Sequence, residues 1–130
     1  MGGRTHVVKV VGGWAEFDVS RDGKILLRIK ITAEVDGIRR DYVITYGRRG
    51  ADNEVVGLAT AKADAPGGRE ADAERLAAVI KALTDKEPRI RRMKNGRIMI
   101  VCDREHLEGF KRYAELAEAI EKWLEETRGR

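Results

Sequence analysis

The residues of this chain that could support catalysis are few and scattered. Cys102 and His106 are four positions apart, with Asp103 between them, and this spacing could begin a metal site or a Cys–His nucleophile pair. A tetrahedral zinc site needs four ligands, and His6 is the only other histidine. Cys102 falls on the apolar face of a predicted strand, where a thiol packs and stays inert. We therefore predict a buried structural cysteine and no metal site.

The hydroxyl and carboxylate residues also lack a catalytic arrangement. Ser20 is the only serine and stands beside a predicted turn, which argues against a serine nucleophile. The chain has no glycine-rich phosphate loop. A two-metal nuclease needs carboxylates that converge on its ions, whereas the aspartates of the first predicted hairpins are spread along the sequence. They are Asp18, Asp22, Asp36 and Asp41. No residue set selects an active site, so we predict a non-catalytic protein without a cofactor.

The basic residues carry the strongest functional signal. Residues 1–50 hold ten basic and six acidic side chains, and residues 89–102 hold five basic side chains and no acidic one. The segments with helical patterns are acidic instead. A basic sheet over acidic helices is typical of a protein that binds a polyanion. The alternative is a solvated surface in which the charges neutralise each other, with RIRRMK serving as an edge strand that resists aggregation.

The clearest structural pattern is KILLRIKITAEV, in which alternate side chains are apolar. Period two over this length predicts a half-buried strand. Asp36-Gly37 then predicts a two-residue type I′ turn. That turn places Ile31 opposite Tyr42 on a core face, and Ile29 and Leu27 follow opposite Ile44 and Tyr46. The other face of this hairpin carries Arg28, Lys30 and Arg39.

Two further hairpins are predicted from glycine-containing turns. Val7–Val11 and Trp14–Val19 would pair around Gly12-Gly13. The sequence RIRRMK-NG-RIMIVC would turn at Asn95-Gly96, and Glu54–Thr60 is a further strand. A two-residue turn at Asn95-Gly96 divides the side chains of its hairpin between two faces. Met93, Ile98, Ile100 and Cys102 share one face, and Arg92, Lys94, Arg97 and Met99 share the other.

Two helices complete the predicted fold. The first follows Pro66-Gly67-Gly68 and buries Ala73, Leu76 and Ile80 at spacings of three and four. The second covers about residues 110–127, with Asp103 as an N-cap and Gly109 separating a short first turn. We therefore predict one α+β domain over residues 1–130, an antiparallel sheet of hairpins with two helices packed on one face. Residues 1–62 form a β meander, and residues 69–127 form a helix, a hairpin and a helix.

Composition indicates habitat and compartment. The chain has no glutamine and only two asparagines, and charged residues fill its surface positions instead. Few thermolabile amides and many charges are typical of hyperthermophile proteins. No apolar run approaches the length of a membrane span, and the first residues lack the features of a signal peptide. We expect a cytoplasmic protein that has no membrane partner.

The second half of the chain resembles a known group of proteins. The segments ALTDKEPRI and HLEGFKRYAELAEAIEKWLEET carry most of the resemblance, and DGIRRDYVITYG carries less. They resemble the multicopy PaREP-type hypothetical proteins of hyperthermophilic crenarchaea. The resemblance implies an archaeal or mobile-element origin and no established activity.

The order hairpin, helix, hairpin, helix is similar to half of a LAGLIDADG homing endonuclease, in which an antiparallel sheet forms a basic saddle on duplex DNA. The likeness implies that Arg28, Lys30, Arg39, Arg92, Lys94 and Arg97 are saddle residues. The chain departs from that family at its defining feature, because no helix ending in a catalytic acid precedes the Lys24–Tyr46 hairpin. Glu16 would be the only remnant of the acidic residue that binds the catalytic metal in that family. The resemblance therefore implies binding of DNA without cleavage.

We therefore predict a nucleic-acid-binding protein that holds duplex DNA on the open sheet face. The same six cations would contact phosphates and base edges. RNA-binding sheets usually add exposed aromatic side chains, whereas Tyr42 and Tyr46 are predicted on the core face, which favours a duplex. One alternative is a protein-interaction module, such as a homodimer that uses Met99 and Val101. Another alternative is a degenerate nuclease.

Overall fold

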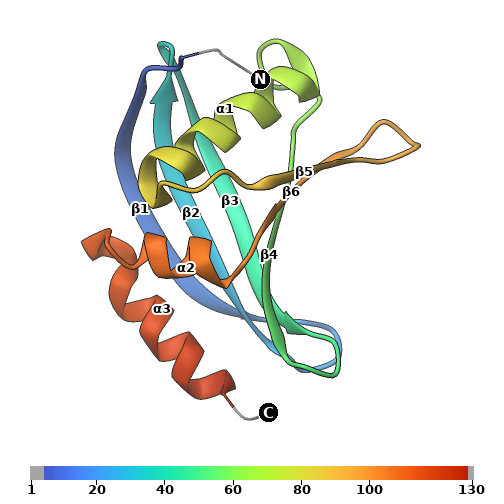
Figure 1. The fold of residues 1–130 in the computed structure, drawn as a ribbon, viewed down its shortest axis with the longest axis vertical. Coiled ribbons are helices and arrows are strands. Elements are labelled where there is room, and N and C mark those ends of the chain that lie inside the picture. The colour runs from blue at the N-terminus through green and yellow to red at the C-terminus, as the bar shows by residue number, and fades with distance from the viewer. Residues whose placement is uncertain (1–4, 129–130) are drawn as a thin grey trace.

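The computed structural model describes residues 5–128, so residues 1–4 and 129–130 of the predicted domain lie outside it. One six-stranded antiparallel sheet carries three helices on one face (Figure 1). Helix accounts for 31% and strand for 41% of the described residues, which confirms the predicted α+β class. The elements are β1 (Val8–Val19), β2 (Ile25–Val35), β3 (Ile38–Arg49), β4 (Glu54–Thr60), α1 (Gly68–Thr84), β5 (Arg89–Arg92), β6 (Ile98–Cys102), α2 (Arg104–Phe110) and α3 (Ala114–Thr127).

The two halves of the chain build the same sheet. Its strand order is β1-β2-β3-β4-β6-β5, so the first four strands form a meander and the later hairpin extends it. β6 pairs with β4, which leaves β5 as one edge of the sheet and β1 as the other. The two predicted basic hairpins therefore belong to one sheet, but β4 lies between them.

The β2–β3 hairpin has the predicted register. Ile31 lies opposite Tyr42, Ile29 opposite Ile44 and Lys30 opposite Val43. Asp36 and Gly37 both have positive φ, 52° and 83°, as a type I′ turn requires. The odd-numbered side chains of β2 from Leu27 to Val35 are fully buried under the helices, and the even-numbered ones face away from them. The alternation of apolar side chains and the type I′ turn at Asp36-Gly37 require the same register, so two independent features determine it.

The predicted hairpin at Gly12-Gly13 is wrong. β1 is one continuous strand that pairs with β2 from Val8 to Val19, with a bulge between Val10 and Gly12. The chain turns later, where the backbone N–H of Gly23 donates to the carbonyl of Ser20. A Cβ on Gly13 would lie 2.7 Å from the ring of Tyr113. This glycine therefore permits close packing under the α2–α3 connection, and it does not make a turn.

The predicted register of the β5–β6 hairpin is wrong by one residue. Arg92 pairs with Ile98, where the sequence predicted Met93 in that place. The backbone N–H of Met93 donates to the carbonyl of Arg97, so the loop holds three residues and ends on Gly96 with φ of 88°. Glycine supplies positive φ in this loop as readily as in a two-residue turn. One extra loop residue exchanges the two faces of β5.

The last predicted helix is divided into two. Asp103 caps α2 as predicted, and its side chain accepts from the backbone N–H of His106. The helix ends at Phe110, close to Gly109, where an added Cβ would lie 2.7 Å from the Cβ of Thr84. α3 buries Leu116, Ile120, Trp123 and Thr127.

Trp123 fixes α3 to the sheet. Its side chain is 0% exposed, and its indole N–H donates to the carbonyl of Ile25 at 3.0 Å. The ring of Tyr46 lies 6.5 Å away between centroids, and the guanidinium carbon of Arg48 lies 5.6 Å from the Trp123 ring centroid. Arg48 also donates to the hydroxyl of Thr127 at the end of α3. Aromatic burial and a cation over the ring both stabilise this contact.

Within residues 5–128, no helix is both long enough and apolar enough to cross a membrane.

Candidate nucleic-acid interface

The residues with the spacing of a metal site are committed to local structure. Cys102 is 0% exposed on β6. The Nδ1 atom of His106 accepts from the backbone N–H of Asp103 at 3.0 Å, and its Nε2 lies 3.1 Å from the carbonyl of Glu87. Both ring nitrogens are thus occupied by backbone groups, with Nε2 carrying the proton. In the part of the chain that is described, no group of three or more potential ligands could hold a metal ion.

Burial makes Cys102 a poor nucleophile. It raises the pKa of the thiol to about 12. At pH 8 only about one molecule in ten thousand carries the reactive thiolate. We expect iodoacetamide to leave Cys102 unmodified over hours in the folded protein and to alkylate it promptly in urea, as followed by intact mass. Rapid alkylation without urea would show that this part of the sheet opens.

The hydroxyl and carboxylate groups of the first hairpins serve turns and strand pairs. Ser20 donates to Asp22 and accepts from the backbone N–H of Lys24 within one turn. The four aspartates each bond a different partner and do not converge. Asp18 pairs with Arg28, Asp22 with Ser20, Asp36 accepts from the backbone N–H of Val7, and Asp41 accepts from Thr32.

The first predicted set of basic residues lies on the open face of the sheet, as expected, but acidic neighbours neutralise much of it. Arg28 bonds Asp18 at 2.5 Å, and the ammonium of Lys30 lies 3.7 Å from the carboxylate of Asp41. Arg39 stands opposite Glu34 in the β2–β3 register. Arg28 and Lys30 must break existing ion pairs before they can hold a phosphate, so this part of the open face is a weak polyanion site.

The second predicted set lies on an arm that we define as residues 89–97, comprising β5 and the loop that follows it. Every residue of this arm is exposed. The hairpin extends away from the body of the molecule (Figure 1). The arm contains no acidic residue and five cations, which are Arg89, Arg91, Arg92, Lys94 and Arg97.

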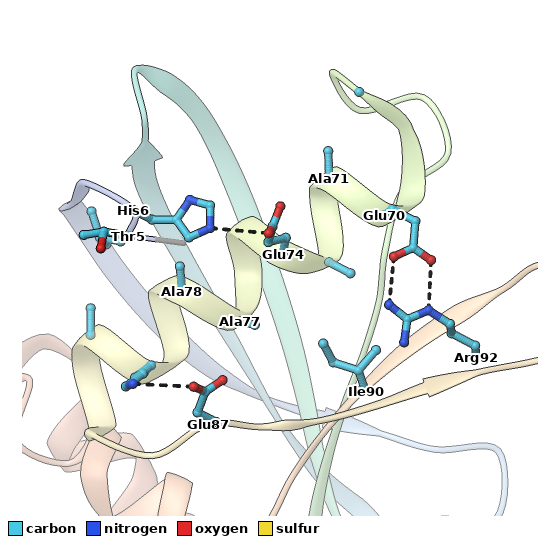
Figure 2. Close-up of a pocket in the computed structure, with 15 residues that line it drawn as sticks. Thr5, His6, Glu70, Ala71, Glu74, Ala77, Ala78, Glu87, Ile90 and Arg92 are labelled. Atoms are coloured by element: carbon cyan, nitrogen blue, oxygen red, sulfur yellow. Dashed lines mark hydrogen bonds and ion pairs between the residues drawn. The ribbon is translucent and has the colours of Figure 1, made fainter. Parts of the chain in front are cut away.

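Arg92 does not lie on the open face, which corrects its predicted place. The register shift directs Arg92 and Ile90 to the same face as Ile98, towards α1. Figure 2 shows the Arg92 guanidinium meeting the carboxylate of Glu70, with two hydrogen bonds of 2.8 and 2.9 Å. The hydrogen bond from Arg92 lowers the pKa of Glu70. Arg92 is therefore the cation that ties the arm to the helix layer.

The register shift brings two unpredicted cations to the open face. Arg89 and Arg91 lie opposite Val101 and Met99, whose side chains face away from α1. Arg69 at the start of α1 also approaches the loop, since an added Cβ on Gly96 would lie 3.3 Å from its guanidinium. The count of basic residues in RIRRMK pointed to this segment, but the predicted set of binding residues did not include Arg89 and Arg91.

The two basic sets do not form one cluster. The sheet order places β3, β4 and β6 between β2 and β5. Strands lie about 4.8 Å apart, so β2 and β5 are separated by about 19 Å across the sheet. Leu58 of β4 and Met99 of β6 lie between the two sets on this face. The six predicted residues are therefore not brought together, and the arm is the better candidate.

Two other surfaces are less suited to a charged partner. Val101, predicted as part of a contact surface, is 5% exposed and already packed. A groove of about 1390 Å³ runs along α1 between the start of β1 and β5. Its polar and charged side chains contact each other across it, as His6 does with Glu74 (Figure 2) and Lys81 with Glu87.

Comparison of the chain with models of protein families, with curated proteins and with solved structures finds no match. The resemblances to PaREP-type proteins and to LAGLIDADG endonucleases stay predictions.

Proposed function

We propose that this protein is a non-catalytic nucleic-acid-binding protein that holds duplex DNA through its basic arm. The observation that carries the proposal is the density of unpaired positive charge on residues 89–97. Among the described residues, no acidic side chain forms an ion pair with four of the five cations of the arm. These four are Arg89, Arg91, Lys94 and Arg97.

The shape of the arm suits a duplex. The major groove of B-DNA admits a two-stranded β-ribbon, and the tip of the β5–β6 hairpin, which extends past the pairing of β6 with β4, has this form. Its cations lie on the open face and at the tip, where they could follow a groove and contact phosphates on both sides. The apolar side chain of Met93 is also exposed near the tip of the arm and adds contact area.

The proposal also explains why Arg92 has a different role from its neighbour. Arg91 faces open solvent, whereas Arg92 bonds Glu70 on the other side of the ribbon. Arg92 positions the arm against α1, and Arg91 is available for a phosphate. Adjacent arginines on opposite faces therefore offer a matched pair of variants.

We expect Arg91→Gln to weaken duplex binding about tenfold and Arg92→Gln to weaken it less than threefold. The first variant removes a cation that binds a phosphate, whereas the second removes an exposed ion pair of small energetic value. Fluorescence anisotropy with a labelled duplex at low salt measures both affinities. Equal decreases would show that the two faces of the arm bind alike, and unchanged binding in both would remove the arm as the site.

A further inference from the structure

One edge of the sheet is the long strand β1. It has twelve residues, and within residues 5–128 it pairs with β2 alone. Figure 1 shows it along one margin of the sheet. The other edge strand, β5, has only four residues. A long edge strand presents a row of backbone N–H and C=O groups without partners, so it is a template for pairing with a further strand.

The helices lie against one face of β1. Tyr113 and Leu116, at the start of α3, pack over Gly13. Near the end of α3, the indole of Trp123 donates to the carbonyl of Ile25 on β2. α3 therefore begins over β1 and crosses towards the middle of the sheet, so it does not follow the outer edge. The side chains of β1 on this face are only half-buried, whereas those in the middle of β2 are fully buried. A strand added beside β1 would complete the core at this margin.

Hydrogen bonds at the two ends of β1 decide which of its backbone groups point outward. The carbonyl of Val7 accepts from the N–H of Asp36, and the N–H of Ser20 donates to the carbonyl of Lys24. Both ends therefore direct these groups towards β2. Successive residues of an antiparallel strand alternate in this respect, and the alternation continues from each end up to the bulge in β1. The residues whose backbone groups point outward are Val8, Val10, Gly13, Ala15 and Phe17.

These outward groups match those of a second, antiparallel copy of β1. A twofold axis through Gly13 places Val10 opposite Ala15 of the second copy. The next such pair is Val8 with Phe17, and the bulge residue of each strand stays unpaired. Every outward residue then meets an outward residue, and such pairs exchange two hydrogen bonds. All of these residues are on the helix side of β1, so the side chains of each pair also share a face, as neighbouring strands require.

The same register continues a row of alternating charges across the axis. Within one copy, Arg39 lies opposite Glu34, and Glu34 lies opposite Lys9. Glu16 lies opposite Arg28, also on the open face. The axis through Gly13 places Lys9 opposite Glu16 of the second copy, so the signs alternate from one copy into the other. The symmetry repeats this row, and opposite charges on facing positions of two strands stabilise their pairing.

Other antiparallel registers lose this match. Moving the axis to Ala15 removes the pairing of Lys9 with Glu16. Moving it to Phe17 places Glu16 opposite Asp18, a pair of like charges. Hydrogen-bond direction, side-chain face and charge therefore select one register of β1 paired with itself. A second copy of this chain is the occupant that fits the edge.

We propose that two copies of this chain form a twofold dimer through antiparallel pairing of their β1 strands about Gly13. The interface uses the same patch of both copies, as in most symmetric dimers. The axis is perpendicular to the sheet, so the two sheets become one, with all helices on one side and both basic arms on the open face. The dimer goes beyond the proposed function and does not depend on it.

Ala15→Pro tests the pairing of the strands. The N–H of Ala15 points away from β2, so proline removes no bond of the sheet and suits such an edge position. In the dimer it removes a donor at two symmetric places. We expect sedimentation equilibrium of the wild type at micromolar concentration to give twice the chain mass of 14.6 kDa. Ala15→Pro should raise the dimer dissociation constant on the order of 100-fold, with a urea midpoint close to that of the wild type.

Cysteines at two facing positions test the register. Lys9→Cys/Glu16→Cys places thiols of the two copies in a pair without hydrogen bonds, whose Cα atoms lie about 4.5 Å apart, within the range of a disulfide. Within one copy the two positions are about 20 Å apart along the strand, so the bond cannot form internally. We expect mild oxidation to give a covalent dimer of the double variant and of neither single variant. The buried Cys102 takes no part.

Three results would overturn the inference. One is a wild type that stays at 14.6 kDa up to the limit of its solubility. Another is a folded Ala15→Pro variant that dimerises as strongly as the wild type. The third is cross-linking of either single variant as efficient as that of the double variant, because the two copies would then meet in a different register.

Discussion

Reversing the charge of Arg91, Lys94 and Arg97 together is expected to lower the affinity for duplex DNA on the order of 100-fold or more. Each cation that neutralises a phosphate releases counterions, and a reversed charge repels the same phosphate. The slope of log affinity against log salt should become shallower by about three units, one for each phosphate that is no longer neutralised. Anisotropy titrations across a salt series measure both quantities.

The matched control reverses three exposed cations far from the arm. Arg21 and Lys24 lie in the β1–β2 turn and Lys122 lies on α3, so this variant changes the net charge by the same amount. We expect it to lower the affinity less than fivefold. If both triple variants lose affinity equally, the protein binds DNA through its overall charge, and the arm is not a site.

The largest effect on stability is expected from Trp123→Ala. The substitution removes a fully buried ring, its hydrogen bond to Ile25 and its contacts with Tyr46 and Arg48. Removing a buried tryptophan costs about 3–5 kcal/mol in the free energy of unfolding. Because small domains are stable by only about 5–15 kcal/mol, we expect a large drop in the urea midpoint measured by circular dichroism.

The only other tryptophan gives the control. Trp14 is 48% exposed on the open face of β1, and we expect Trp14→Ala to cost about 1 kcal/mol or less. The difference between the two variants isolates the contact of α3 with the sheet. Equal costs would contradict the packing of α3 described above.

The sequence predicted those parts of the fold in which two independent signals agree. In the β2–β3 hairpin, the alternation of KILLRIKITAEV and the Asp36-Gly37 turn demand the same register, and the structure has it. The N-cap at Asp103 and the packed thiol of Cys102 were likewise predictable from local chemistry. These features depend on neighbours in the sequence.

The errors occur where a glycine has more than one use. Gly13 suggests a turn, yet it lies in a long strand because Tyr113, far along the chain, packs against it. Gly96 suits both a two-residue and a three-residue loop, and the packing of Ile90 towards α1 accompanies the longer one. Tertiary contacts decide both cases, and a single sequence does not contain them.

The candidate site was predictable in position but not in detail. Charge counting identified RIRRMK as the most basic segment, and the structure leaves this segment exposed. The strand register decides on which face each arginine lies, and the predicted register was wrong by one residue. Arg89 and Arg91 were therefore missed, and Arg92 was placed on the wrong face. The pairing of Arg28 and Lys30 with acidic residues depends on strand neighbours as well.

The measurement that tests the central claim most directly is the salt dependence of wild-type binding to a labelled duplex. The four unpaired cations of the arm predict a slope of log affinity against log salt of about −4, because each phosphate contact contributes about −0.9. A slope near that value would support the arm as the binding element. Absent binding at low salt, or binding with a slope near zero, would contradict the account.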